Sequence, residues 1–234
     1  DGRIEAFFQF AEGLARMPAF RDANTPPREK TALLVQEAAR DSIIREIGFI
    51  DNQGTYHGAD GKTVDVRERE YVRRALDGQN FISEPYVSKI DNSLVITVAV
   101  PIYDDNRQVI GVVMTDIKAE WLSKQIDDII VGKTGYCYIL GITGDTAAHR
   151  NMELVEKRAN PIEVAKRNSS YAALAEFTQK ALSSKDSSVG EYLYQGGITI
   201  AAYATIPTTQ WKVIVSAPKN EFMGTVDQLR VSLL

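Results

Sequence analysis

The sequence predicts an α+β fold, with two small antiparallel sheets that follow one another along the chain and helices packed on them. Two observations support this class. Apolar, β-rich runs occur as neighbouring pairs joined by short turns, as in 94–103 and 109–114 around Asp104-Asp105-Asn106-Arg107. The same order of elements, a strand pair, a helix, a strand triplet and a helix, also occurs twice in the 234 residues.

The first 45 residues are predicted to be mainly helical. Apolar side chains recur at close to helical spacing between Asp1 and Phe20. Pro26-Pro27 interrupts this pattern, and a second helical pattern begins at Arg28. We expect amphipathic helices that cover one face of a sheet.

The first repeat of the element order is predicted between residues 46 and 132, and turn signals such as Asp77-Gly78 separate its elements. The charged helix in this stretch has Arg and Glu at spacings that allow i,i+4 pairs on a solvated face. In order, the predicted elements are strands Ile47–Ile50 and Thr55–His57, helix Arg67–Leu76, an extended piece Phe81–Lys89, strands Leu94–Tyr103 and Val109–Thr115, and helix Ile117–Ile130.

The second repeat follows the loop Val131–Gly135 and has the same plan. A small antiparallel sheet with a helix lying on it is the PAS-like layout, so the fold is predicted to be two PAS-like modules. The predicted elements are strands Tyr136–Leu140 and Thr146–His149, helix Tyr171–Leu182, strands Val189–Tyr194, Ile198–Ile206 and Trp211–Ala217, and a final helix that begins at Pro218.

Composition and motifs disfavour several functions. The net charge of −4 gives no basic footprint for nucleic acid. With two histidines and one cysteine, the chain has no Cys/His cluster, and we predict neither a metal site nor a cofactor. The sequence lacks the G-x-S-x-G, Walker A, G-x-G-x-x-G and H-E-x-x-H motifs, so we predict no catalytic residues and no enzyme. Cys137 lies mid-strand and is interpreted as buried packing.

Several short sequence segments resemble a known family. F-I-S-E-P-Y-V-S-K, V-A-V-P-I-Y-D-D-N, V-I-G-V-V-M-T-D-I and K-T-G-Y-C-Y-I-L-G occur in this order. They resemble the double Cache domains (dCache_1) of bacterial sensors, and the resemblance covers nearly the whole chain. Such domains are extracytoplasmic ligand-binding regions of chemotaxis receptors, histidine kinases and cyclic-dinucleotide enzymes.

The resemblance implies a layout and a context. Residues 1–45 would be stalk or covering helices, 46–132 the membrane-distal ligand-binding module with its linker helix, 133–217 the membrane-proximal module, and 218–234 a helix leading to a transmembrane segment. The chain has no apolar run of about 18 residues, starts without Met and ends abruptly, so we expect the soluble part of a longer protein. The parent protein would be a membrane-anchored homodimer, with a methyl-accepting chemotaxis protein favoured over a histidine kinase or a diguanylate cyclase.

Five residues are candidates for binding a small molecule in the first module. A free α-amino acid needs a cation for its carboxylate and an anion for its ammonium group, and both must be paired when they are buried. Arg69 and Asp116 are the candidates for these two roles. Tyr71, Tyr86 and Tyr103 are candidates for hydroxyl donors and an aromatic wall.

The resemblance supports part of this set. The amino-acid-sensing branch of the family has the pattern Y-x4-R-x-W-Y, then a Tyr, then an Asp at the end of a G-V-x-x-x-D strand. In this chain the pattern falls on Val64, Arg69, Tyr71, Val72, Tyr86 and Asp116, so Val64 and Val72 stand where the family has tyrosines. These tyrosines belong to the carboxylate-binding half of the family's site. A plain amine, a modified amino acid or another small metabolite therefore becomes an alternative ligand. Asp116 has a second interpretation as the N-cap of a helix that begins at Ile117.

The second module offers Tyr136, Tyr138 and Tyr203 without a matching Arg–Asp pair. We therefore predict that tight ligand binding occurs in the first module alone. Two hypotheses from other classes stay open: a soluble PAS-like enzyme in which Arg69 and Asp116 act on a bound substrate, and a dimerisation module whose pocket is empty.

Overall fold

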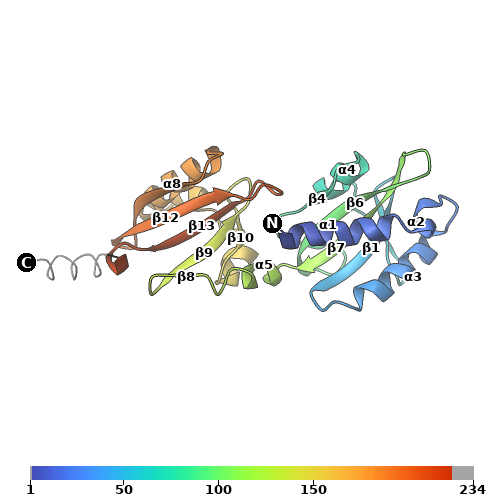
Figure 1. Ribbon diagram of the computed structural model, residues 1–234, viewed down its shortest axis with the longest axis horizontal. Coiled ribbons are helices and arrows are strands. Elements are labelled where there is room, and N and C mark those ends of the chain that lie inside the picture. The colour runs from blue at the N-terminus through green and yellow to red at the C-terminus, as the bar shows by residue number, and fades with distance from the viewer. Residues whose placement is uncertain (1, 223–234) are drawn as a thin grey trace, which may run out of the picture. The chain divides into compact units, whose positions relative to one another are not determined.

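A computed structural model describes residues 2–222 of the chain, which form two compact units (Figure 1). One unit extends to Trp121 and the other begins at Leu122. We call them the first module and the second module and describe each by itself. In the described part of the chain, no helix is long and apolar enough to cross a bilayer.

The first module contains five helices, the last of which crosses its boundary, and seven strands among the described residues. Its helices are α1 (Gly2–Ala15), α2 (Pro18–Arg21), α3 (Pro27–Ala38), α4 (Glu70–Leu76) and α5 (Glu120–Lys124). Its strands are β1 (Ile44–Asp51), β2 (Thr55–His57), β3 (Thr63–Asp65), β4 (Phe81–Ile82), β5 (Tyr86–Val87), β6 (Leu94–Tyr103) and β7 (Val109–Lys118).

The sheet of the first module has the order β3-β2-β1-β7-β6-β4, with β5 also paired to β6, and every pairing is antiparallel. The hairpin of β6 and β7 lies at its centre, with a register that runs from Val95 opposite Lys118 to Tyr103 opposite Val109. The predicted adjacency of 94–103 and 109–115 is therefore confirmed. The loop between them contains Arg107 at a positive φ of 64°, which a tight turn requires.

Both faces of this sheet are covered, which explains why β6 and β7 are almost continuously apolar. Helices α1 and α3 cover one face, where Phe49 of β1 lies beneath the buried Lys30 of α3. Helix α4 covers the other face, where Tyr71 and Val72 pack on Met114. Because side chains alternate along a strand, the α4 face receives the even-numbered positions of β7 and includes Asp116.

The second module repeats this plan. Its elements are β8 (Ile130–Val131), β9 (Gly135–Leu140), β10 (Thr146–Ala148), α6 (Met152–Glu156), α7 (Pro161–Ala165), a 3₁₀ turn (Ser169–Tyr171), α8 (Ala172–Ser183), β11 (Ser188–Tyr194), β12 (Gly197–Thr205) and β13 (Lys212–Pro218). The sheet order is β10-β9-β13-β12-β11, with β8 beside β9, and all pairings are antiparallel. Helix α8 packs Leu174, Phe177 and Ala181 on one face of this sheet.

The prediction of two antiparallel PAS-like sheets is confirmed, but some elements differ. The expected helix 117–130 is wrong, because β7 continues to Lys118 and only α5 is helical. Ile117 is paired on both sides, to Ile44 and to Ile96, and this central ladder outweighs local helix propensity. The expected helix within 1–20 is divided into α1 and α2, because Pro18 starts a new helix. Strands β3 and β8 and helices α6 and α7 were not predicted. The predicted final helix falls mainly on residues 223–234, outside the described residues.

Candidate ligand-binding site

A row of polar side chains crosses the three central strands of the first module. Glu46 of β1 lies opposite Asp116 of β7, and Asp116 lies opposite Thr97 of β6. The middle of a covered sheet is normally apolar, because a polar group buried there costs free energy unless it is hydrogen-bonded, and a charge costs more. A row of this kind in the centre of the sheet is therefore the strongest candidate for a functional site.

Asp116 is held by a chain of hydroxyl groups. Its side chain is 2% exposed. The Thr97 hydroxyl donates to Oδ1 of Asp116 at 2.5 Å, and the Tyr86 hydroxyl lies 2.6 Å from Thr97 Oγ1. Because a hydroxyl has one proton and Thr97 gives it to the carboxylate, Tyr86 is the donor to Thr97. Thr97 is itself fixed through Ser83, whose Oγ accepts from the Thr97 amide at 2.8 Å.

The electrostatics of Asp116 follow from this burial. Desolvation raises the pKa of its carboxyl group to about 7, although the hydrogen bond from Thr97 lowers it and the nearby Glu46 raises it further. Among the described residues, Asp116 has no ion-pair partner. A bound ammonium group would supply the missing positive charge and would return the pKa toward its ordinary value.

Glu46 is a second carboxylate beside Asp116. It is partly buried, and its Oε1 accepts a short hydrogen bond from the Tyr56 hydroxyl. Burial raises the pKa of Glu46, partly offset by the Tyr56 hydrogen bond, and burial also raises the pKa of Tyr56 well above its usual value. The Tyr56 hydroxyl is therefore a neutral donor that holds one oxygen of Glu46.

Tyrosine rings border the row beneath α4. The rings of Tyr71 and Tyr86 are stacked, with centroids 5.8 Å apart and planes at 28°. Burial raises the pKa of Tyr71 to about 12 and that of Tyr86 still higher, so both hydroxyls remain protonated donors at neutral pH. These rings give the polar row an aromatic wall.

Arg69 lies at the outer side of that wall. It is the residue before α4, and its backbone is extended, with φ −68° and ψ 134°. Its guanidinium carbon is 4.8 Å from the centroid of the Tyr86 ring, and its Nη2 donates to the carbonyl oxygen of Val87 at 3.3 Å. Arg69 is thus linked to Asp116 through Tyr86 and Thr97, and makes no direct contact with it.

The segment 88–93, which we call the cover, borders the Glu46 end of the row, where Ile90 and Asp91 line a hollow together with Glu46. Ile90 packs against the core cluster that includes Tyr56 and Tyr71. Both sequence neighbours of Ile90 form ion pairs. Lys89 pairs with Glu68, and Asp91 pairs with Arg45 at 2.6 Å. Because Asp116 is buried, a ligand that reaches it must displace some of the side chains that pack around it.

The structure brings four of the five predicted site residues together: Arg69, Tyr71, Tyr86 and Asp116. Tyr103 lies elsewhere, near the end of β6, and its hydroxyl donates to the carbonyl oxygen of Gly78 at 3.1 Å. A bulge between Ile102 and Tyr103 shifts the register at this end of the strand. The N-cap interpretation of Asp116 is wrong, because Asp116 lies inside β7 and α5 begins four residues later.

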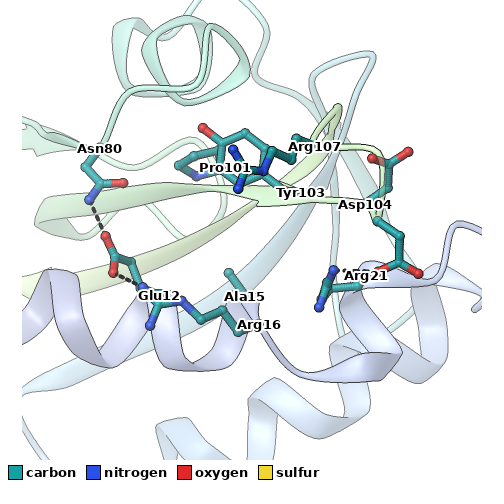
Figure 2. A pocket seen from close by; sticks show the side chains of 10 residues that line it. Glu12, Ala15, Arg16, Arg21, Asn80, Pro101, Tyr103, Asp104 and Arg107 are labelled. Atoms are coloured by element: carbon teal, nitrogen blue, oxygen red, sulfur yellow. Dashed lines mark hydrogen bonds and ion pairs between the residues drawn. The ribbon is translucent and has the colours of Figure 1, made fainter.

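Tyr103 borders a separate cavity of about 660 Å³ between α1, α2 and the β6–β7 hairpin (Figure 2). Acidic and basic side chains already pair along it: Glu12 with Arg16 at 2.6 Å, and Arg21 with Asp105 at 2.5 Å. Both pairs are exposed, so they add little stability and leave the cavity mixed in charge. The lining residues are Glu12, Ala15, Arg16, Arg21, Asn80, Pro101, Tyr103, Asp104, Asp105 and Arg107.

Sequence reasoning missed Glu46, Tyr56 and Ser83. A signal for the row was present, because Thr97 is the one polar residue between Leu94 and Ile102. Strand alternation places Thr97 on the same face as the tyrosine wall, which identifies that face as polar. Glu46 gave no comparable signal, because a glutamate near the start of a strand is usually solvated.

Comparisons with known proteins agree with this architecture. The fold is a domain of two PAS-like modules, the first of which has a buried polar row across its sheet. A family model described as the Cache domain, dCache_1, matches residues 1–226. The chain belongs to the dCache_1 family.

One curated relative is the methyl-accepting chemotaxis protein McpB of Bacillus subtilis, which is 31% identical over 161 residues. The matched region is 66% of this chain and 23% of McpB, so the chain spans about a quarter of the length of that relative. TlpA of the same organism, also a methyl-accepting chemotaxis protein, is 28% identical over 166 residues, which cover 70% of this chain and 22% of TlpA.

Among solved structures, the ligand-binding domain of the Pseudomonas aeruginosa chemoreceptor PctB in complex with L-Arg has a TM-score of 0.69 and 20% identity. The alignment covers 94% of this chain and 89% of PctB's domain. At this level of identity the likeness establishes the shared fold of the two modules.

Proposed function

We propose that this chain is the extracytoplasmic ligand-binding domain of a membrane-anchored methyl-accepting chemotaxis receptor. In this proposal residues 46–132 form the membrane-distal module and 133–217 the membrane-proximal module. Residues 1–45 and 218–234 connect them to transmembrane segments in a homodimer. Family membership and the chemotaxis relatives support the receptor class, and the fold neighbour PctB, solved with L-Arg, supports an amino acid or amine as the ligand class.

The ligand is proposed to bind in the first module through a cationic nitrogen. The observation that carries this proposal is the burial of Asp116 without an ion-pair partner among the described residues. A buried carboxylate that lacks a cation raises the free energy of the folded state, and a ligand ammonium group relieves that penalty. Thr97 and Tyr86 orient the carboxylate, and Tyr71 with Tyr86 supplies the aromatic wall.

In this proposal the signal arises when the ligand displaces the cover, segment 88–93. A ligand that displaces segment 88–93 disturbs two ion pairs, from Lys89 to Glu68 beside α4 and from Asp91 to Arg45 on β1. The ligand shifts the equilibrium between covered and open forms by its difference in affinity for them. The alternative in which Arg69 and Asp116 act together on one substrate is disfavoured, because Tyr86 and Thr97 stand between them.

A thermal-shift screen followed by titration calorimetry tests the proposal. Amino acids, amines, purines and small carboxylates are screened against the purified domain, and any hit is titrated into Asp116→Asn and into the matched control Asp128→Asn, which removes an exposed carboxylate. Loss of one charge-assisted hydrogen bond, about 1.5–3 kcal/mol, should weaken binding about 10- to 100-fold in Asp116→Asn. The control should bind as the parent does. An anionic ligand without an amine, or equal affinity in Asp116→Asn, would contradict the proposal.

A further inference from the structure

We propose that the ligand of the first module is a short aliphatic diamine, held by Asp116 and Glu46 together and carrying no α-carboxylate. This inference rests on the proposed function and names the ligand class for the same site. The observation behind it is the placement of Glu46 directly opposite Asp116 on the neighbouring strand, with both side chains on the α4 face.

Each of the two carboxylates has one oxygen held and one oxygen available. Tyr56 donates to Oε1 of Glu46, and Thr97 donates to Oδ1 of Asp116. No described residue donates to Oε2 of Glu46 or to Oδ2 of Asp116. The hydroxyl groups thus orient both carboxylates in the same manner and leave an acceptor on each for a ligand.

The spacing of the pair suits two ammonium groups on one short chain. Directly opposed residues of adjacent antiparallel strands have Cβ atoms about 4.5–5.5 Å apart. Two carboxylates so close repel each other, so neutralising one leaves the other without a partner. A ligand with a single ammonium group brings one positive charge to two carboxylates, whereas a diamine brings two.

The nearby guanidinium groups are engaged in other contacts, which disfavours a zwitterionic ligand. Arg69 stacks over the Tyr86 ring and donates to the carbonyl of Val87. Arg45 is paired with Asp91 at 2.6 Å. An α-carboxylate next to the bound ammonium would therefore lie beside Asp116 or Glu46 without a cation, and like charges there reduce affinity.

The surroundings of the pair match the apolar middle of a diamine. Tyr71 and Tyr86 present stacked rings, and Ile90 and Val64 pack against the same core cluster. Methylene groups buried against such side chains contribute to affinity without needing hydrogen bonds. The site thus pairs two negative ends with an apolar border, which is the complement of a short aliphatic dication.

Three probes that differ by one group each test the inference. These are 1,4-diaminobutane, butylamine, which lacks the second amine, and ornithine, which is the same diamine with an α-carboxylate. Calorimetric titration at pH 8 into the purified domain should show 1,4-diaminobutane binding at least about 10-fold more tightly than butylamine and than ornithine, as one additional charge-assisted contact predicts.

A matched pair of variants locates the second ammonium group. Glu46→Gln keeps the acceptor oxygen for Tyr56 and removes the charge, and Glu70→Gln removes an exposed charge on α4 as the control. In Glu46→Gln the preference for 1,4-diaminobutane over butylamine should fall to within about threefold, while the affinity for butylamine is kept. In Glu70→Gln all three affinities should match those of the parent.

The outcomes separate this inference from the proposed function. Binding of butylamine or ornithine as tightly as 1,4-diaminobutane overturns the diamine assignment and leaves an amine or amino-acid sensor. Unchanged preference in Glu46→Gln also overturns it. Binding of another amino acid or monoamine, with none of the three probes bound, has the same meaning. If no amine or amino acid binds, the proposed function fails as well.

Discussion

The two modules share one sheet plan but differ in the row of side chains at its centre. In both, a hairpin provides two central strands and an earlier strand lies beside them: β1-β7-β6 in the first module and β9-β13-β12 in the second. The first row is Glu46, Asp116 and Thr97. The corresponding row is Tyr136, Ser216 and Ala201, aligned by the same kind of antiparallel register.

The second row is neutral, and its surroundings are packed. Phe177 of α8 lies 4.9 Å from the ring of Tyr192 and 5.7 Å from that of Tyr203, and all three belong to the module's core cluster. The cation of this region, Arg150, lies 4.0 Å over the Tyr136 ring. The same sheet plan thus holds a charged row in the first module and a neutral row in the second.

The largest expected effect comes from placing a charge in the neutral row. In Ser216→Asp a carboxylate would be buried at a position that is neutral in the parent, because Ser216 is 4% exposed between two paired strands. We expect the second module to lose about 3 kcal/mol or more of unfolding free energy at pH 8. Trp211, also in this module and buried, reports the transition by fluorescence in a Trp121→Phe background during urea denaturation.

The matched control is Ser187→Asp, which adds the same charge at an exposed position of the same module. It should change the transition by less than about 0.5 kcal/mol. A small effect of Ser216→Asp would mean that the second row tolerates a charge, and the comparison between the rows would then lose its energetic basis.

The next largest effect is the unfolding free energy that the folded state loses by burying the charge of Asp116. Asp116 has a folded-state pKa of about 7, above its value in the unfolded chain, so the folded state holds more protons between about pH 4 and pH 7. The parent should therefore lose stability relative to Asp116→Asn as pH rises through this window, by up to about 1.4 kcal/mol per pH unit. Between pH 5 and pH 8 the difference in unfolding free energy should change by about 2–3 kcal/mol.

Thermal or urea unfolding of both proteins without ligand, at several pH values, measures this difference. Glu70→Gln serves as control, since Glu70 is exposed and pairs with Arg74 at 3.3 Å. Parallel pH profiles for the parent and Asp116→Asn would show that Asp116 has an ordinary pKa. The buried carboxylate would then not be a source of binding energy.

Much of the fold could be predicted because local pattern and tertiary structure agree. Strand 94–103 is β6 as predicted, and the predicted strand Thr55–His57 is β2. The predicted elements were wrong where pairing with neighbouring strands determined the secondary structure. Ile117 and Lys118 continue β7 because β1 and β6 pair with them on both sides, which a local helical pattern does not reveal.

The candidate site could be predicted in part, for a related reason. Arg69 and Asp116 stand out by residue type, and the structure places both near Tyr86. Glu46 belongs to the row only because β1 lies beside β7 in a register that no local motif encodes. Tyr103 was grouped with the site by its residue type, whereas the bulge at the end of β6 places its hydroxyl near Gly78.

We expect pH to have a moderate effect on ligand affinity. If a cationic ligand binds ionised Asp116, it must displace the proton below a pKa of about 7. Affinity for 1,4-diaminobutane should be constant above about pH 8 and should fall up to about 10-fold per pH unit below pH 7. Asp116→Asn should bind weakly with a flat profile over this range. Tighter binding at pH 6 than at pH 8 in the parent would contradict a role for ionised Asp116.

The smallest effect concerns the cover of the charged row. Lys89 and Glu68 form an ion pair whose side chains are about half exposed, so it contributes about 0.2–1 kcal/mol to holding segment 88–93 in place. Glu68→Gln should leave the unfolding free energy within that range and raise the open population about twofold. If the ligand reaches Asp116 after the cover opens, as proposed, the association rate should rise by the same factor. Stopped-flow mixing with 1,4-diaminobutane measures it, and raised salt should accelerate the parent more than the variant, since screening weakens the same ion pair. Glu163→Gln, which removes an exposed carboxylate paired with Lys166 at 2.6 Å, should leave the rate unchanged. Equal rates in the parent and Glu68→Gln at low salt would show that ligand entry does not require this part of the cover to move.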